Sequence, residues 1–327
     1  MILQVRPLRI GPITLELPAV LAALAGYTNL PYRLICRRLG APYCSTEAML
    51  DRQLLLPGKL RRRLVHTDPA DHPVAGQIMG NDPKVMAQAA AELCREGFDV
   101  VDLNFACPVR KVLARRRGGY LMRQPELALE ILRAVLAAAD RPVTLKLRRA
   151  FDDEPEMQAA FWRIAEGAFD AGAAAICVHA RTAQQRYTGK ADWEFLSKVK
   201  SHFADKTVIG SGDALSAPQA AELLRQTGVD GVSLARGALG NPWIFRQLAD
   251  HLAGRPMYRP DLLEQRQLLE AHYSHALQLF GPRRAPKMLR SFGIKYARLH
   301  PHPSAVRVEF VNIDSEGDWQ AVLERHY

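Results

Sequence analysis

Hydrophobic residues along the chain gather in short runs, and longer stretches of mixed polarity separate these runs. The runs, which we interpret as buried strands, lie at residues 19–26, 43–49, 73–80, 100–106, 142–148, 175–182, 207–213 and 231–239. Intervening stretches such as DPKVMAQAAAELCREG and PELALEILRAVLAAAD begin with Asp or Pro and repeat their apolar positions with a helical period. Strands that alternate with helices in this way predict βα units and a parallel sheet.

Two folds of the α/β class contain such a sheet, the (β/α)8 TIM barrel and the doubly wound open sheet. The series of strands within residues 19–239 matches the size of a barrel. A doubly wound sheet usually carries a glycine-rich phosphate loop after its first strand. The segment ALAGYTN at that place lacks the G-x-G-x-x-G spacing, so the pattern favours the barrel.

Beyond residue 246 the alternation ends. Residues 261–280 and 286–300 have helical patterns, and Pro286 suits the first turn of the second helix. We therefore predict a catalytic barrel domain over residues 1–246 and a small all-helical domain over residues 247–327. On the second helix, positive side chains within an arc of about 140° form a stripe of Lys287, Arg290, Lys295 and Arg298.

Polar residues stand at or just after the ends of several predicted strands. They are Gln77, Asn104, Cys107, Lys146, His179, Arg181 and Asp213. Barrel enzymes build their active sites at the carboxyl ends of the strands. The pattern therefore predicts one active site formed by these side chains.

Composition narrows the class of protein. Hydrophobic residues make up 48% and charged residues 24% of the 327 residues, the profile of a soluble globular protein. The formal net charge of +10 favours a polyanionic partner such as nucleic acid, although a merely basic surface is the alternative. No apolar run approaches the roughly 20 residues that span a bilayer, so we expect no membrane segment.

The five cysteines contain no C-x-x-C pair, which argues against a disulfide framework, a zinc site or an iron–sulfur cluster. We therefore expect no metal. Reduced thiols are typical of a cytoplasmic protein.

Several motifs occur in an order that resembles a known family. They are LAALAGYTNLPYR, GQIMGNDP, DLNFACPVRKV, LKLRRAFDD, CVHARTAQQRYTG, IGSGD and ARGALGNPWIF. Together they are similar to the tRNA-dihydrouridine synthases, flavin-dependent barrels that reduce uridine in tRNA, and NPWIF is most like the bacterial B-type members. The segment RSFGIKYA resembles the RNA-binding segment of the family. The resemblance implies FMN as cofactor, NADPH or NADH as reductant, tRNA as partner and a tRNA-binding role for residues 247–327.

Reduction of the uracil C5–C6 bond requires a hydride and a proton. An unperturbed thiol has a pKa near ~8.5 and is mostly protonated at neutral pH, so a cysteine can donate the proton. The resemblance assigns this role to Cys107, and the alternative is a buried structural thiol.

Lys146 alternates with Leu145 and Leu147 and should therefore point into the barrel mouth. The resemblance implies that it stabilises the anionic edge of reduced flavin; the alternative is an ion pair with Asp102. His179 is expected beside the same edge, and Gln77 at the isoalloxazine edge, through its amide.

The segments GSGD and LARGALG supply backbone donors for a flavin phosphate, with Arg236 as the charged contact. The predicted flavin-binding set comprises Ala23, Leu24, Gln77, Lys146, His179, Ser211, Gly212, Asp213, Ala235 and Arg236. Three positions depart from the family. Ser211 stands where Asn is frequent, and Ala235 and Ala106 stand where Gly is common. Ala106 should be tolerated unless its backbone needs a positive φ.

Asn104 and Arg181 are predicted to bind the uracil, because an amide and a forked guanidinium suit its polar edges. Glu47 and Arg148 are further substrate-side candidates. Lys111, Lys287, Arg290 and Lys295 are predicted to contact the RNA backbone.

Three other functions fit parts of this pattern. The first is a flavin barrel that acts on a free pyrimidine or another small molecule, which would need no basic helical domain. The second is a dihydrouridine synthase that acts on ribosomal RNA. The third is a non-catalytic RNA-binding barrel, which would not need Cys107, Lys146, His179 and Arg181. The target uridine stays open, and we expect a monomer.

Overall fold

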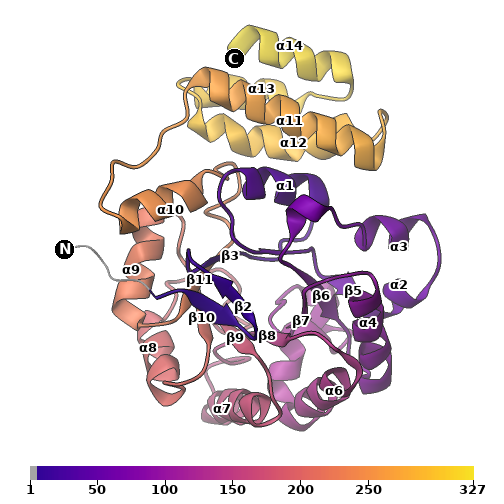
Figure 1. Ribbon diagram of the computed structural model, residues 1–327, viewed down its shortest axis with the longest axis vertical. Coiled ribbons are helices and arrows are strands. Elements are labelled where there is room, and N and C mark those ends of the chain that lie inside the picture. The colour runs from indigo at the N-terminus through magenta and orange to yellow at the C-terminus, as the bar shows by residue number, and fades with distance from the viewer. Residues whose placement is uncertain (1–5) are drawn as a thin grey trace.

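The computed structural model describes residues 6–327 and shows a closed parallel barrel with helices around it (Figure 1). The barrel strands are β3 (Ala19–Leu21), β4 (Cys44–Ser45), β5 (Met49–Leu50), β6 (Val74–Met79), β7 (Val100–Asn104), β8 (Val143–Arg148), β9 (Ala175–His179), β10 (Val208–Ser211) and β11 (Gly231–Leu234). Because β3 pairs with both β4 and β11, the sheet closes on itself. The predicted TIM barrel is confirmed.

The second strand position differs from the single run predicted at 43–49. Two short strands, β4 and β5, share it, and both pair with β6. The chain leaves the ladder at Thr46, whose hydroxyl oxygen accepts a hydrogen bond from the Gln77 backbone N–H at 3.0 Å. Strand β8 ends at Arg148, as predicted. The other strands end before their predicted hydrophobic runs do, and the remainder of each of those runs lies in the loop at the carboxyl end of the barrel.

Amphipathic helices surround the barrel. They are α1 (Leu30–Arg38), α4 (Pro83–Arg95), α6 (Pro125–Ala138), α7 (Pro155–Asp170), α8 (Trp193–His202), α9 (Ala217–Thr227) and α10 (Ile244–Leu252). The shorter helices α2 (Asp51–Leu55), α3 (Lys59–Leu64) and α5 (Arg110–Leu113) follow strands on the active-site side. The sequence predicted that Asp or Pro begins the helices, and this is confirmed at α4. The Asp82 carboxylate caps this helix by accepting hydrogen bonds from the backbone N–H groups of Lys84 and Val85.

A hairpin that we did not predict covers the amino end of the barrel. It consists of the antiparallel strands β1 (Leu8–Ile10) and β2 (Ile13–Leu15), which lie in front of the barrel in Figure 1. Leu8 and Ile10 are buried and pack with barrel residues such as Val100. The hairpin therefore closes this end with apolar side chains and leaves the carboxyl end for the site.

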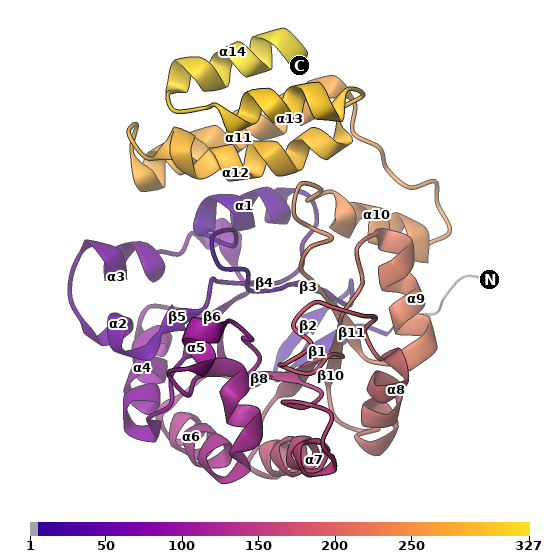
Figure 2. The same ribbon diagram turned by 180° about the vertical axis from the view of Figure 1, so that it is seen from behind.

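The C-terminal helices form a layer over α1 and beside α10 (Figures 1 and 2). They are α11 (Leu262–Phe280), α12 (Ala285–Tyr296), α13 (Pro303–Val311) and α14 (Glu316–His326). The predicted boundary after residue 246 lies inside α10, which buries Ile244, Phe245 and Leu248. Since α10 packs on α9, it belongs to the barrel, and the connection to the helical layer follows Leu252.

The stripe predicted on the second helix must also be corrected. Helix α12 ends at Tyr296, and residues 297–299 form a 3₁₀ turn, so Arg298 leaves the arc of the helix. Its guanidinium donates to the Gly237 carbonyl at 2.8 Å and joins the helical layer to the barrel.

An aromatic cluster forms the seam between barrel and helical layer. The Tyr32 ring of α1 packs 5.7 Å from the His272 ring of α11 and 5.1 Å from the Phe292 ring of α12. The Tyr32 hydroxyl donates to the Ala238 carbonyl at 2.6 Å, and His272 Nδ1 lies 3.0 Å from the Tyr296 hydroxyl. Burial in this cluster lowers the pKa of His272 to about 3.

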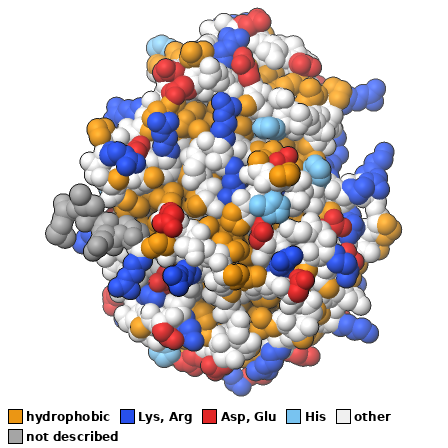
Figure 3. Space-filling model, viewed as in Figure 1, with side chains coloured by type: hydrophobic (Ala, Val, Ile, Leu, Met, Phe, Trp, Pro, Cys, Tyr) orange, Lys and Arg blue, Asp and Glu red, His pale blue; other side chains and the backbone are white. Residues whose placement is uncertain are grey.

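Positive and negative side chains are interspersed on the face that carries the hairpin, and positive ones project from the edge where α3 lies (Figure 3). Within residues 6–327, no helix has both the length and the hydropathy to cross a membrane. All five cysteines lie in the described part of the chain and are free thiols.

Candidate active site

A cavity of about 360 Å³ opens at the carboxyl ends of the barrel strands. The α5 ribbon lies at the same end of the barrel (Figure 2). The volume of the cavity is in the range of cofactor and ligand pockets. The predicted site residues that line it are Ala23, Leu24, Gln77, Asn104, Cys107, Lys146, Arg148, His179, Ser211, Gly212, Asp213, Ala235 and Arg236. The strand-end pattern therefore brings together side chains that are far apart in the sequence.

Lys146 places its ammonium in this cavity without a partner. Its Nζ is buried and has no hydrogen-bond partner among the described residues. Asp102, the alternative partner, instead accepts hydrogen bonds from Gln77 at 2.6 Å and from Thr144 at 2.8 Å. An unpaired buried cation is costly unless an anion joins it, so the cavity is suited to a ligand with negative charge.

His179 presents a neutral imidazole to the same cavity. Burial, together with the positive charges of Lys146 and Arg148, lowers the pKa of His179 to about 2. Its Nδ1 lies 3.3 Å from the Ser211 hydroxyl, and its buried Nε2 has no partner in the described chain. When Ser211 donates to Nδ1, Nε2 carries the proton and is a hydrogen-bond donor towards the cavity.

A chain of hydrogen bonds anchors the loop that carries Cys107. Asn104 Oδ1 accepts from the backbone N–H groups of Ala106 at 3.1 Å and Cys107 at 2.9 Å. Asn104 Nδ2 donates to Gln77 Oε1 at 2.6 Å, and Gln77 in turn donates to Asp102. The two amides that the sequence assigned to uracil and flavin therefore also hold the thiol in place.

Two glycines pack directly under Cys107. Gly119 N–H donates to the Cys107 carbonyl at 3.0 Å. Gly118 has a φ of +58°, and a Cβ there would lie 2.9 Å from the Cys107 Cβ. Ala106 is not among the described residues with positive φ, so alanine is accommodated where the family has glycine.

The thiol of Cys107 stays protonated at neutral pH. Burial raises its pKa, while the Val109 backbone N–H and the Arg148 charge act in the opposite direction with smaller effect. Arg148 is itself buried and donates to the Ala106 carbonyl at 2.8 Å and to the Thr182 carbonyl at 2.7 Å. It thus ties the Cys107 loop to the loop after β9.

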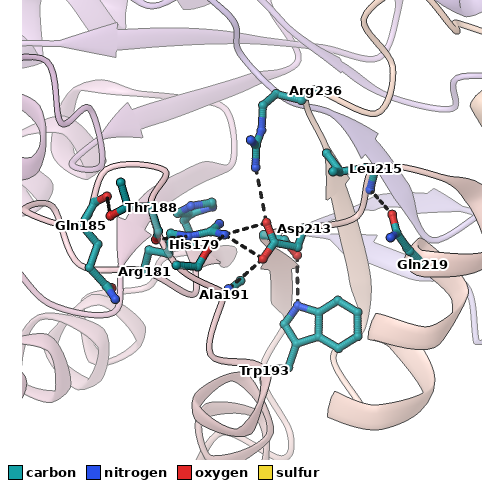
Figure 4. A network of polar contacts seen from close by, with 12 residues as sticks. His179, Arg181, Gln185, Thr188, Ala191, Trp193, Asp213, Leu215, Gln219 and Arg236 are labelled. Atoms are coloured by element: carbon teal, nitrogen blue, oxygen red, sulfur yellow. Dashed lines mark hydrogen bonds and ion pairs between the residues drawn. The ribbon is translucent and has the colours of Figure 1, made fainter.

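Arg181 is organised differently from the prediction. Its side chain is 2% exposed, does not line the cavity, and binds both carboxylate oxygens of Asp213 at 2.7 Å (Figure 4). It also donates to the carbonyls of Thr188 at 3.1 Å and Gly189 at 2.6 Å. The structure therefore places Arg181 behind the wall of the cavity, where it holds the loop after β9.

Asp213 joins this network to the phosphate-binding end that we predicted. Burial raises its pKa, but hydrogen bonds from Arg181 and the Ala191 backbone outweigh burial and keep the pKa below its usual range. Arg236 lies 3.4 Å from Asp213 and 5.4 Å from the centroid of the Tyr187 ring, with 43% of its side chain exposed. Arg236 also lines the cavity, and Figure 4 shows its guanidinium directed towards Asp213.

Tyr187 is a lining residue that the sequence analysis did not single out. Its side chain is 57% exposed at the cavity mouth, and the Arg148 guanidinium lies 5.8 Å from the ring centroid. The feature of the sequence that could have identified Tyr187 is its place in the segment QQRYTG, directly after the H-A-R-T motif. Exposed aromatic rings beside a cavity are suited to contact with a flat ligand.

The remaining predicted residues lie outside the cavity. Glu47 accepts a hydrogen bond from the Gly26 backbone, and Lys287 forms an exposed ion pair with Asp314 at 3.1 Å. Lys111, Arg290 and Lys295 are exposed. Across residues 6–327, no group of His, Cys, Asp and Glu is arranged to hold a metal ion.

These features define a TIM-barrel enzyme with a preformed, positively charged cavity around a protonated thiol. The model of the family described as Dihydrouridine synthase (Dus) matches residues 20–326. The chain belongs to the dihydrouridine synthase family, an oxidoreductase family.

Similar curated proteins cover nearly the whole chain. The tRNA-dihydrouridine synthase B of Xanthomonas campestris pv. campestris is 36% identical over 98% of this chain and 95% of its own length. The tRNA-dihydrouridine synthase B of Shewanella oneidensis is 35% identical, over 98% of each chain. The protein of the same name from Pseudomonas aeruginosa is 36% identical over 89% of this chain and 85% of its own length.

Solved structures of two enzymes share the barrel at low sequence identity. A 2-naphthoyl-CoA reductase complex has a TM-score of 0.60 at 12% identity and covers 77% of this chain and 52% of that one. Histamine dehydrogenase from Rhizobium sp. 4-9 has a TM-score of 0.57 at 14% identity, over 82% of this chain and 50% of that one. These similarities show the fold alone.

Proposed function

We propose that the protein is an FMN-dependent tRNA-dihydrouridine synthase, which reduces the C5–C6 bond of a uridine in tRNA with NADPH as reductant. The observation that carries this proposal is one cavity that holds the Cys107 thiol, the unpartnered Lys146 ammonium and the neutral His179 imidazole. The family and the tRNA-dihydrouridine synthase B relatives support the same reaction.

The residues present fit a flavin mononucleotide. Lys146 Nζ and His179 Nε2 are buried donors without partners in the described chain, and they suit the anionic pyrimidine edge of a reduced flavin. The backbone of Gly212 and the guanidinium of Arg236 suit its phosphate. When bound, reduced FMN supplies the hydride for uracil C6.

The chain itself supplies the proton and the environment for the second half of the reaction. The Cys107 thiol donates its proton to uracil C5, and its raised pKa keeps the proton available at neutral pH. The thiolate that remains lies near the positive charge of Arg148, and a proton from solvent restores the thiol for the next turnover.

The substrate must bring a base out of its stack, because the thiol lies within the cavity. Arg115 and Arg116 follow the Cys107 loop and are exposed, as is Lys111 of α5, so they are placed to contact RNA phosphates. Arg117 differs, since its guanidinium lies 4.0 Å from the buried carboxylate of Asp51. Of the three consecutive arginines 115–117, the first two are therefore exposed to solvent, and Arg117 is directed towards the protein.

The test is nucleoside mass spectrometry, with position mapping, on an unmodified tRNA transcript incubated with protein, FMN and NADPH. We expect dihydrouridine at a defined position. A bound, reducible flavin without dihydrouridine in tRNA would contradict the proposal. Ribosomal RNA and free pyrimidines would then be the next substrates to test.

A further inference from the structure

A second pocket, of about 110 Å³, lies on the seam between the barrel and the helical layer. Residues that line this seam pocket include Glu47, Arg63, His66, Phe280, Arg284 and Met288. Arg63 belongs to α3 of the barrel, whereas Phe280 and Arg284 belong to the helical layer. The volume suits a phosphate group with bound water rather than a second cofactor.

The seam pocket shares a wall with the active-site cavity. Ser45 and Ala48 line the cavity, and Thr46 and Glu47, which lie between them in the chain, line the seam pocket. Both spaces therefore adjoin the same segment after β4. A polymer with one unit in the cavity can therefore reach the seam pocket with a neighbouring unit across this short segment.

Two guanidinium groups from different domains line this pocket, and the charge of the Glu47 carboxylate there offsets only part of their repulsion. Among the described residues, no carboxylate forms an ion pair with Arg63 or Arg284. The Glu47 carboxylate, which is also present, accepts a hydrogen bond from the Gly26 backbone. Burial and, after it, the charge of Arg284 lower the pKa of Arg63, while the Glu47 carboxylate acts in the opposite direction with smaller effect.

The ring of Phe280 fixes the orientation of one of these groups. The Arg63 guanidinium lies 5.5 Å from the centroid of this ring. Stacking on an aromatic face restricts the side chain and leaves its N–H edge free to donate. A phosphate oxygen between Arg63 and Arg284 would accept these hydrogen bonds and relieve the repulsion.

We infer that the seam pocket binds a backbone phosphate of the RNA next to the target uridine, clamped by Arg63 from the barrel and Arg284 from the helical layer. This inference rests on the proposed function, because it assumes that a uridine occupies the cavity. An RNA backbone is favoured over the phosphate of a dinucleotide because the positive charge continues on both sides of the pocket, at the exposed Lys59 and Arg62 and at the exposed Arg283. A chain of phosphates matches such an extended surface.

The first test compares two double variants. The seam variant carries Arg63→Ala and Arg284→Ala, and the control variant carries Arg9→Ala and Arg141→Ala. The control removes the same charge from exposed positions at the amino end of the barrel. Binding of a fluorescein-labelled, unmodified tRNA transcript is measured by anisotropy at several salt concentrations. We expect about tenfold weaker binding for the seam variant. We also expect its plot of log K against log salt to be less steep by about one.

The second test locates the phosphate. A methylphosphonate, which has no charge, replaces one phosphate at a time on either side of the target uridine. We expect one replacement to weaken binding to the unaltered protein but to have little further effect on the seam variant, the result of a coupled pair. FMN content and NADPH oxidation without RNA report whether the variant is folded, and both should match the unaltered protein.

The inference is overturned if the seam variant binds tRNA like the control variant, or if no methylphosphonate position couples to it. It is also overturned if tRNA binding is unchanged while the KM for NADPH rises, because the pocket would then bind the dinucleotide. Absence of dihydrouridine with the unaltered protein would instead contradict the proposed function. The binding experiment would still show whether the seam pocket binds RNA.

Discussion

Lys146 and His179 show what a single residue contributes to this site. Each keeps a buried nitrogen without a partner in the described chain, although an unsatisfied buried polar group costs about 1–3 kcal/mol or more. A ligand that accepts hydrogen bonds from both nitrogens would supply the partners that the chain does not. A positively charged, preformed cavity of this kind needs little rearrangement when its ligand binds.

The Cys107 assignment makes a prediction at the same scale. Cys107→Ala should bind FMN and oxidise NADPH normally but reduce uridine at least about 100-fold more slowly, because a positioned acid contributes about 10²- to 10⁴-fold. Single-turnover dihydrouridine formation, measured by mass spectrometry, checks this. Cys94→Ala, at a half-buried thiol outside the cavity, is the control. Full activity of the Cys107 variant would remove the thiol from the reaction.

Sequence patterns predict which residues line the cavity better than they predict which contacts those residues make. Alternation along β8 places Lys146 inward, because side chains of a strand alternate between faces. Arg181 lies two residues past His179, beyond the end of β9, where alternation no longer determines direction. Its position depends on the carboxylate of Asp213 and the carbonyls at 188 and 189, and these contacts exist only after the loop folds.

At the scale of elements, glycines place the loop after β7. Gly118→Ala should move the Cys107 loop, because it introduces both a left-handed alanine and a Cβ contact at 2.9 Å. Gly97→Ala is the matched control: its φ is also positive, but no atom lies within 4 Å of the new Cβ. Both variants should lose about 1 kcal/mol or more of stability in urea unfolding. Only Gly118→Ala should also lose dihydrouridine formation, and equal activity of the two variants would contradict this role of the loop.

The loop after β9 depends on Arg181 in a way that proteolysis can measure. Lysine cannot reproduce the forked contacts with Asp213, Thr188 and Gly189, so Arg181→Lys should open this loop more often. Trypsin should then cleave at Arg186 or Lys190 several-fold faster than in the unaltered protein. Arg225→Lys, at an exposed residue of α9 that pairs with Glu222 and does not contact this loop, is the control. Unchanged cleavage would mean that other contacts hold the loop.

Two elements show why the fold was only partly predictable. The hairpin of β1 and β2 is too short to show an alternating pattern, and it is stable because Leu8 and Ile10 fill the end of the barrel. Helix α10 has a clear apolar face, but its first two residues, Ile244 and Phe245, are also the end of the NPWIF motif. The motif therefore runs into the helix without a break, and the predicted boundary after residue 246 fell inside it. Both elements depend on tertiary packing that local patterns do not contain.

At the scale of the whole molecule, the aromatic seam makes barrel and helical layer one packed unit. Tyr32, His272 and Phe292 contact one another across the seam, and Arg298 adds a hydrogen bond to the barrel. The seam pocket lies along the same boundary. The two arginines that we assign to an RNA phosphate therefore extend from backbone segments on opposite sides of this packed boundary.

The buried histidine of the seam predicts how stability depends on pH. His272 is neutral in the folded state, with a pKa of about 3, whereas an unfolded histidine has a pKa near ~6.5. Below pH ~6.5 the unfolded chain therefore binds a proton that the folded chain excludes. Stability falls by about 1.4 kcal/mol per pH unit as the pH decreases towards 3, which amounts to about 2 kcal/mol at pH 5.

His272→Gln removes this titration and keeps an acceptor for the Tyr296 hydroxyl. Urea unfolding at pH 7.5 and pH 5 should therefore show a smaller loss of stability in the variant, by about 2 kcal/mol, even if the variant is less stable at both values. His179 also has a lowered pKa, but it is present in both proteins and cancels in the comparison. Equal losses in the two proteins would mean that the folded state does not lower the pKa of His272, which would contradict this prediction.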